Sequence, residues 1–300
     1  MDEHESVADV AGDGADVLNK PKREKRFPVM EIFGPTIQGE GNVLGMRTMF
    51  IRFGGCDYRC TKCDSLHAVL PELVSAGAQW LTTQDILENL AEIEDTSEVP
   101  PMVTLSGGNP CMHKLDDLVD RLNEHDVAIA VETQGTIWQD WLLKCDFVTI
   151  SPKGPGMGEK FEPARFSQFL ARLSEYEENL GRGAIHWCVK IVVQDQRDIE
   201  FVKDILSAWP SILDRPGKMY LSLGNPMPPV PVLLGERQLA AAFVSELKNL
   251  PPCENLDDFR ANLLHNYAIL VSEILKEPLL RNCIVTPQFH VLLWGNKQGV

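Results

Sequence analysis

The sequence has no excess of basic residues. Its 300 residues include 28 Lys and Arg against 43 Asp and Glu, which gives a formal net charge of −15. Proteins whose main task is to coat nucleic-acid phosphates need a basic surface, so this charge excludes that class. We therefore expect no direct contact with nucleic acid. A few well-placed cations could still hold a small anionic ligand.

Long apolar runs and a secretory leader are also missing. No stretch approaches the roughly 20 apolar residues that a membrane-spanning helix needs. The first residues, MDEHESVADVAGDGADV, are partly acidic and contain no apolar core of a signal peptide. We therefore expect no membrane association and a reducing, cytoplasmic location.

Cysteine is too sparse for a disulfide scaffold. The chain has 8 cysteines in 300 residues, whereas disulfide-rich proteins are small and carry cysteine at a much higher density. Three of them, Cys56, Cys60 and Cys63, nevertheless lie close together in the sequence. In a reducing compartment such a cluster more often binds metal than forms a disulfide.

The chain divides into a short tail and one long core. Residues 1–26 have no periodic apolar face and predict a disordered tail, and residues 27–300 form one core domain in which strand-like and helical segments alternate. The expected strands are 47–53, 102–105, 127–131, 147–150, 187–193, 219–223 and 283–286. The expected helices are 83–93, 115–125, 198–208, 235–249 and 256–276, of which the last two belong to a helical insertion at about 230–282.

This alternation predicts an α/β protein with parallel strands and crossover helices. Periodicity alone leaves open whether the strands form an open sheet or a barrel. In both arrangements, ligands bind at the carboxyl ends of the strands.

The cysteine cluster forms the pattern CxxxCxxC directly after the expected strand 47–53. Three thiolates on one loop can bind three irons of a [4Fe-4S] cluster and leave the fourth iron open to an outside ligand. The alternative is a closed zinc site in which His67 joins the three cysteines. The loop by itself leaves both possibilities open.

A paired-glycine segment follows the next expected strand. It has the sequence Thr104-Leu105-Ser106-Gly107-Gly108-Asn109-Pro110, and paired glycines let the backbone approach a ligand closely. One strand–helix unit after CxxxCxxC, this segment resembles the GGEP motif of radical S-adenosylmethionine (SAM) enzymes.

A second segment narrows the resemblance. Residues 31–41, EIFGPTIQGEG, resemble the IQGEG segment of the 7-carboxy-7-deazaguanine synthase family. Further matches follow the family's order and spacing: Asp64 and Ser65 after the cysteines, VETQGT at 131–136, Ser151-Pro152-Lys153, and PQFH at 287–290. The resemblance covers about 31–65, 102–153, 187–227 and the C-terminus.

The resemblance implies a fold, a reaction and a set of partners. The fold is an incomplete (β/α) barrel of about six strands. The reaction is a ring contraction by a carbon–nitrogen lyase, which converts 6-carboxy-5,6,7,8-tetrahydropterin into 7-carboxy-7-deazaguanine with loss of ammonia, in queuosine-type 7-deazapurine biosynthesis. The implied cofactors are a [4Fe-4S] cluster, SAM and Mg²⁺. The implied partners are the small pterin substrate, an external electron donor of the flavodoxin or ferredoxin type, and a second copy of the chain.

The resemblance also implies roles for individual residues. Cys56, Cys60 and Cys63 would bind the cluster and Ser65 would bind Mg²⁺, whereas the radical chemistry would come from SAM. The residues implied at SAM are Lys62, Asp64, Gly108, Asn109, Glu132, Ser151, Pro152, Lys153, Lys190 and Asn225. The residues implied at the substrate are Ile37, Gln38, Gly39, Glu40, Arg52, Ser106, His290 and Val300.

Two residues depart from the pattern. Asn109 replaces the Glu of GGEP, so its amide oxygen would accept a bond from the SAM ammonium without charge assistance. Lys62 stands where many radical SAM proteins have an aromatic side chain against adenine. A glycyl-radical activase, which shares CxxxCxxC but acts on a protein, is an alternative that IQGEG and PQFH argue against, and a non-enzymatic zinc module is another.

Overall fold

A computed structural model describes residues 24–94, 100–180, 185–214, 217–225 and 256–295, together with residues 297 and 299. Most of the expected tail, the expected helix at 235–249 and the expected substrate residue Val300 lie outside the described residues.

The strands form one nine-stranded sheet with the order β3-β1-β2-β4-β5-β6-β7-β8-β9. Their bounds are β1 (Phe27–Ile37), β2 (Arg47–Phe53), β3 (Gln79–Leu81), β4 (Met102–Gly107), β5 (Ala128–Thr133), β6 (Phe147–Ile150), β7 (His186–Val193), β8 (Met219–Leu223) and β9 (Ile284–Thr286). From β2 through β9, each neighbouring pair is parallel, whereas β1 is antiparallel to both β2 and β3. All of the expected strands are confirmed.

The two antiparallel strands, β1 and β3, were not expected, and the reason is local. The sequence of β1 contains Pro28 and Pro35, and a segment with proline is usually predicted to be an edge strand or a loop. The structure accommodates Pro35 at a shift of register between Phe33 and Thr36. Strand β3 spans only 3 residues, which is too short for an alternating pattern to be recognised.

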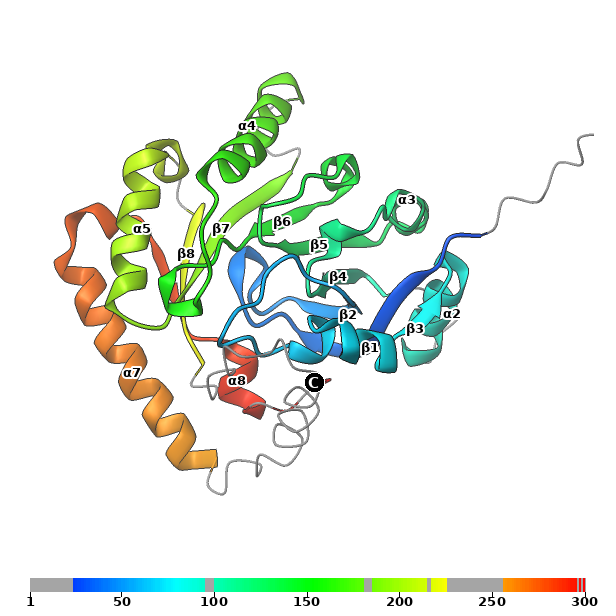
Figure 1. Ribbon diagram of the computed structural model, residues 1–300, viewed down its shortest axis with the longest axis horizontal. Coiled ribbons are helices and arrows are strands. Elements are labelled where there is room, and N and C mark those ends of the chain that lie inside the picture. The colour runs from blue at the N-terminus through cyan, green and yellow to red at the C-terminus, as the bar shows by residue number, and fades with distance from the viewer. Residues whose placement is uncertain are drawn as a thin grey trace, which may run out of the picture.

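The helices are α1 (Pro71–Gly77), α2 (Thr83–Glu94), α3 (Asp116–Glu124), α4 (Pro163–Leu180), α5 (Gln196–Ala208), α7 (Leu256–Lys276) and α8 (Phe289–Trp294). Figure 1 shows α2, α3, α4, α5 and α7 arranged around the outside of the sheet. The expected helices at 83–93, 115–125, 198–208 and 256–276 are confirmed to within two residues at each end, whereas α1, α4 and α8 were not expected.

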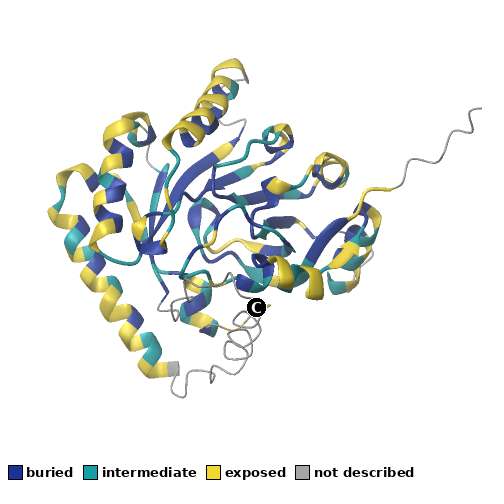
Figure 2. Cartoon of the chain, in the orientation of Figure 1, coloured by how far each residue is buried: buried dark blue, intermediate teal, exposed yellow. Residues whose placement is uncertain are grey.

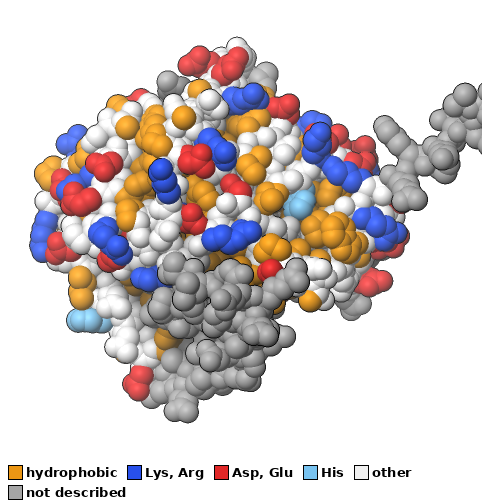
Figure 3. Space-filling model, in the orientation of Figure 1, with side chains coloured by type: hydrophobic (Ala, Val, Ile, Leu, Met, Phe, Trp, Pro, Cys, Tyr) orange, Lys and Arg blue, Asp and Glu red, His pale blue; other side chains and the backbone are white. Residues whose placement is uncertain are grey.

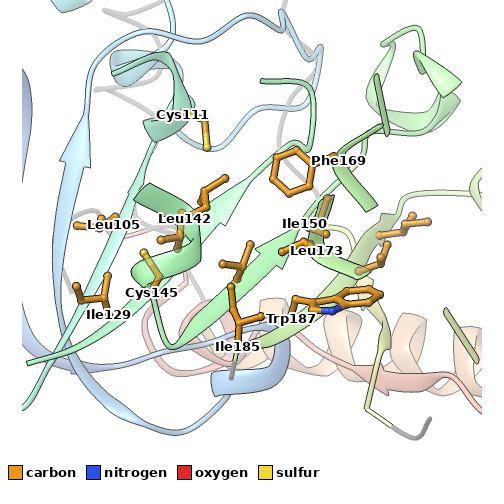
Figure 4. Packing of buried hydrophobic residues seen from close by; sticks show 14 of the residues in the cluster. Leu105, Cys111, Ile129, Leu142, Cys145, Ile150, Phe169, Leu173, Ile185 and Trp187 are labelled. Carbon is orange, nitrogen blue, oxygen red and sulfur yellow. The ribbon is translucent and has the colours of Figure 1, made fainter. Parts of the chain in front are cut away.

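The core lies between the sheet and the outer helices. Figure 2 shows buried strands and helices that are exposed on their outward faces. Cys111 and Cys145 are buried among apolar side chains such as Leu142 and Phe169, as Figure 4 shows. Cys188 is also fully buried, so these three cysteines pack as small apolar residues.

The sheet is open, because the described strands include no pairing between β3 and β9. The α/β class is therefore confirmed, and the open sheet agrees with an incomplete barrel. No described helix is both long enough and apolar enough to cross a membrane. Figure 3 shows acidic and basic side chains interspersed over the visible face.

Candidate active site

The cluster loop, residues 56–63, begins just after the carboxyl end of β2. Cys56 and Cys60 are each 7 % exposed and Cys63 is half-buried, and all three are free thiols. The three side chains belong to one small apolar group that also contains Met157. Three free thiols on one loop in an apolar environment fit a [4Fe-4S] cluster with one open iron.

Loops from three other strands hold the cluster loop in place. Asp57 accepts hydrogen bonds from Asn109 Nδ2 at 2.8 Å and from Thr136 Oγ1. At the other end of the loop, the Thr61 amide donates to the Met157 carbonyl at 2.9 Å. The segments that follow β4, β5 and β6 therefore fix both ends of the loop, and the thiols are positioned before any cofactor binds.

The environment of the thiols favours the protonated form until a cation binds. Burial raises the pKa of Cys60 to about 12, and Lys153 acts in the opposite direction. Burial likewise raises the pKa of Cys56, against the amide of Tyr58 and the charge of Lys153. Metal binding therefore has to displace protons from these cysteines. Lys153, which donates to Ser151 Oγ at 2.7 Å, is the nearby cation that assists.

The Gly107–Gly108–Asn109 turn packs directly against the start of the cluster loop. The Gly108 amide donates to the Phe53 carbonyl at 3.1 Å, and the Asn109 amide donates to the Gly55 carbonyl at 2.7 Å. A Cβ at position 108 would collide with the Gly55 carbonyl, so only glycine permits this close approach.

The side chain of Asn109 is already satisfied within the protein. Its Oδ1 accepts from the Cys111 amide at 3.1 Å and from Thr133 Oγ1 at 3.0 Å, while its Nδ2 donates to Asp57. The carboxylate that faces this turn therefore belongs to Asp57, on the cluster loop.

Lys190 lies at the centre of a buried group of charges. It extends from β7, is 1 % exposed, and donates to Glu40 Oε2 at 2.9 Å and to Glu132 Oε1. Burial opposes its charge, but Glu132 and Glu40 together raise the pKa of Lys190 above its usual value. Burial also opposes the charge of Glu40, but Lys190 and His290 lower the pKa of Glu40 to about 2. Lys190 and Glu40 are therefore both charged at neutral pH.

The C-terminal segment closes against the IQGEG segment. The Phe289 amide donates to the Gly39 carbonyl at 3.1 Å, and Gln288 Nε2 donates to Glu40 Oε1 at 3.0 Å. The ring of His290 lies so close to Gly39 that a Cβ there would collide with it. The IQGEG segment and the PQFH segment, about 250 residues apart in the chain, thus meet. The resemblance to the family implies both at the substrate.

Arg52 lies on β2 next to Ser106 of β4, its partner in the parallel register. Its guanidinium donates to Glu31 Oε1 and, at 3.0 Å, to Ser65 Oγ. The Ser65 hydroxyl donates in turn to Asp64 Oδ1 at 2.9 Å. The residues implied at the substrate carboxylate and at Mg²⁺ thus form one connected group.

Glu31 also binds His67, at 3.3 Å from Nε2. His67, the fourth ligand in the zinc alternative, is therefore engaged by a carboxylate of β1. No three His, Cys, Asp or Glu side chains in the described residues surround a position for a single metal ion. Gly299 lies beside Glu31.

The remaining implied residues lie in three places. Half-buried Ile37 ends β1, and Gln38 Oε1 accepts from the amides of Gly39 and Glu40, so this side chain shapes the turn. Lys62 Nζ donates to Gln194 Oε1 at 3.4 Å, and buried Asn225 follows Gly224, which packs against Gln194. Pro152 is buried in the loop after β6.

Three residues that organise this site were not expected from the sequence: Asp57, Glu31, and Gln134, which donates to Cys56 Sγ and to the Gly108 carbonyl. All three lie inside or beside matched motifs. Their location in or beside these motifs was the one indication in the sequence, because neither charge nor spacing shows which neighbour each side chain contacts.

Curated proteins similar to this chain share one description. The 7-carboxy-7-deazaguanine synthase of Bacillus subtilis (strain 168) is 36% identical over 279 residues, covering 92% of this chain and 99% of the relative. This chain belongs to the 7-carboxy-7-deazaguanine synthase family. The Bacillus cereus 7-carboxy-7-deazaguanine synthase is 34% identical over 280 residues, with coverage of 92% and 99%. No protein-family model matches the chain.

Among solved structures, the crystal structure of QueE from Escherichia coli matches with a TM-score of 0.49 and 24% sequence identity. The match covers 74% of this chain and 89% of that chain. Membership of the 7-carboxy-7-deazaguanine synthase family makes this chain a radical SAM enzyme.

Proposed function

We propose that this chain converts 6-carboxy-5,6,7,8-tetrahydropterin into 7-carboxy-7-deazaguanine with loss of ammonia, as a step in queuosine-type 7-deazapurine biosynthesis. The observation that carries the proposal is the arrangement of one sheet edge. Three free thiols follow β2, and the charged residues Arg52, Glu132 and Lys190 project from β2, β5 and β7. The names of the curated relatives support the same reaction.

Cys56, Cys60 and Cys63 would hold the [4Fe-4S] cluster, and the loops around them would hold SAM. When bound, the cluster and SAM supply a 5′-deoxyadenosyl radical that abstracts hydrogen from the substrate. The residues proposed to hold SAM are Lys62, Asp64, Gly108, Asn109, Glu132, Ser151, Pro152, Lys153, Lys190 and Asn225. Lys153 has a direct reason to take part, because its charge already acts on the thiols.

Arg52 would bind the carboxylate of the pterin. A guanidinium fork matches a carboxylate with two parallel hydrogen bonds. Glu31 now occupies part of that fork, so the substrate carboxylate has to compete with Glu31 or share the guanidinium with it. Ser65, which accepts from Arg52, would place its oxygen on Mg²⁺, a hard cation that takes few protein ligands.

Glu40 and the backbone of 37–39 would recognise the ring. Because Lys190 keeps Glu40 ionised, this carboxylate can only accept hydrogen bonds, which suits the N–H groups of an aminopyrimidinone. Buried sites of this kind discriminate strongly against analogues that cannot pair. His290 closes the same end of the site against Gly39. We also propose Val300, which lies outside the described residues, for substrate binding, because the resemblance to the family implies it.

Two protein partners belong to the proposal. An external one-electron donor of the flavodoxin or ferredoxin type has to approach the cluster. A cavity of about 340 Å³ lies beside Cys56 and is bordered by Trp80 and Met112, whose side chains are 56% and 44% exposed. A second copy of the chain is proposed because α7 exposes Leu264, Ile269 and Leu275, which a homodimer interface would cover.

The test is anaerobic reconstitution followed by turnover. The protein is purified anaerobically, loaded with iron and sulfide, and incubated with SAM, a reductant, Mg²⁺ and the carboxytetrahydropterin. We expect 7-carboxy-7-deazaguanine as product. Cleavage of SAM without this product would reject the substrate, and a colourless protein with stoichiometric zinc and no iron would reject the radical chemistry altogether.

A further inference from the structure

Gln134 makes an unusual pair of contacts in the loop after β5. It is 8% exposed, and its Nε2 donates to Cys56 Sγ at 3.3 Å and to the Gly108 carbonyl at 2.7 Å. One side-chain amide thus bonds both to a sulfur of the CxxxCxxC loop and to the paired-glycine turn.

The contacts themselves determine which way the amide points. A side-chain NH₂ has two donors and no acceptor, and it faces one sulfur and one carbonyl oxygen, which are both acceptors. The reversed amide would place Oε1 against the carbonyl of Gly108 and, once Cys56 is a thiolate, against a second negative atom. The observed orientation leaves the buried Oε1 of Gln134 with no partner among the described residues.

The backbone on both sides of Gln134 is pinned. Thr133 Oγ1 donates to Asn109 Oδ1 at 3.0 Å and accepts from the Gly135 amide at 3.4 Å. Gly135 has a φ of +76°, and a Cβ there would collide with Ile150. The amide of Gln134 is therefore held against Cys56 by the fold.

We propose that Gln134 is a positioning residue that raises the reduction potential of the [4Fe-4S] cluster through its N–H···S bond to Cys56. The inference rests on the proposed function, because it requires Cys56 to bind iron. Reduction moves one electron from the external one-electron donor to the cluster, and no covalent bond forms or breaks. The added negative charge spreads onto the ligand sulfurs, so a hydrogen bond to one of them stabilises the reduced state more than the oxidised state.

The experiment compares three forms of the full chain, each anaerobically reconstituted with iron and sulfide: wild type, Gln134→Met and Gln139→Met. Gln134→Met keeps the length of the side chain and removes both donors. Gln139 is the matched control, because its Nε2 also donates to a backbone carbonyl, that of Cys111 at 2.8 Å, and no hydrogen bond joins it to Cys56. The readout is the midpoint potential in an EPR-monitored redox titration without SAM, with iron content measured in parallel.

We expect Gln134→Met to bind a cluster that is harder to reduce, with the ratio of reduced to oxidised cluster at a fixed potential lowered about three- to tenfold. A tenfold change corresponds to about 59 mV for a one-electron couple. Gln139→Met should titrate as wild type does. An unchanged potential in Gln134→Met overturns the proposal, and so does an equal shift in both variants.

A second variant covers the case in which Gln134→Met binds no iron. Gln134→Leu also removes both donors, with a differently shaped apolar side chain, so the same lowered ratio is expected. A wild-type potential in Gln134→Leu overturns the proposal. If the wild-type chain itself binds no cluster, the proposed function fails. If the wild-type chain binds a cluster whose reduction potential is the same in the residue 134 variants, only the inference about Gln134 fails.

Discussion

The cluster loop and the charged interior, which consists of Lys190, Glu40 and Glu132, are built in opposite ways. The cluster loop places three thiols in an apolar group and is held mainly by backbone and amide hydrogen bonds. The charged interior joins Lys190 to Glu40 and Glu132, which come from three separate parts of the chain. A metal cluster needs ligands at a preset spacing, whereas buried ionised groups need partners of opposite charge.

The largest effect is expected in the cluster loop. Cys60→Ala should abolish reconstituted cluster absorbance and SAM cleavage, because three ligands are the minimum that holds the cluster with one open iron. Absorbance, iron content and 5′-deoxyadenosine formation measure the loss. Cys188→Ala, at an equally buried cysteine of β7, is the control and should keep its cluster. A normal iron content in Cys60→Ala would contradict the assignment of the loop.

The charged interior should respond in stability even without a cofactor. Lys190→Met leaves the Glu40 and Glu132 carboxylates without their cation, and we expect the free energy of unfolding of the apo-protein to fall by about 3–5 kcal/mol. Urea unfolding measures it. Lys203→Met removes a partly exposed lysine that pairs with Glu200 and Glu277, and it should lose much less stability than Lys190→Met. If Lys190→Met is as stable as wild type, Lys190 does not stabilise the buried Glu40 and Glu132 carboxylates.

Asn109 stands where the GGEP motif of radical SAM enzymes has a glutamate, and this difference can be tested by the substitution Asn109→Glu. Asn109→Glu would place a second carboxylate against Asp57 in a fully buried position. We expect the apo-protein to lose about 1–3 kcal/mol of stability and the loop to load less iron. Adding Asp57→Asn should recover most of both losses. A single variant that binds more cluster than wild type would show that Asp57 does not replace the missing glutamate.

The smallest effect is expected at Arg52. Arg52→Lys keeps the charge but loses the two-pronged geometry, so the KM for the pterin should rise about tenfold while cluster content stays normal. Steady-state kinetics measure the KM, and iron analysis measures the cluster content. Arg47→Lys, on the same strand but paired with Glu94 at the surface, should leave KM unchanged. Loss of the cluster in Arg52→Lys would assign Arg52 to the loop and not to the substrate.

The fold was largely predictable because the parallel strands have strong apolar patterns. Val103 and Thr104 of β4, for example, point to opposite faces and are both buried, as expected for a strand covered on both faces. Strand β1 was missed because Pro28 and Pro35 are tolerated at a strand next to the edge. Helix α4 is set back from any matched motif, and its apolar positions, such as Phe166 and Leu173, were not recognised as a helical pattern.

The sequence by itself determined the cysteine spacing, the paired glycines and the order of the motifs. These features are local, since contiguous backbone sets the distance between nearby side chains. The tertiary structure alone decided that Lys190 meets Glu40 and that Gln134 meets Cys56. Gln134 meets Cys56 because parallel strands bring their carboxyl ends to one edge, whereas Glu40 follows the antiparallel strand β1. The register that sets both contacts is a property of the whole sheet.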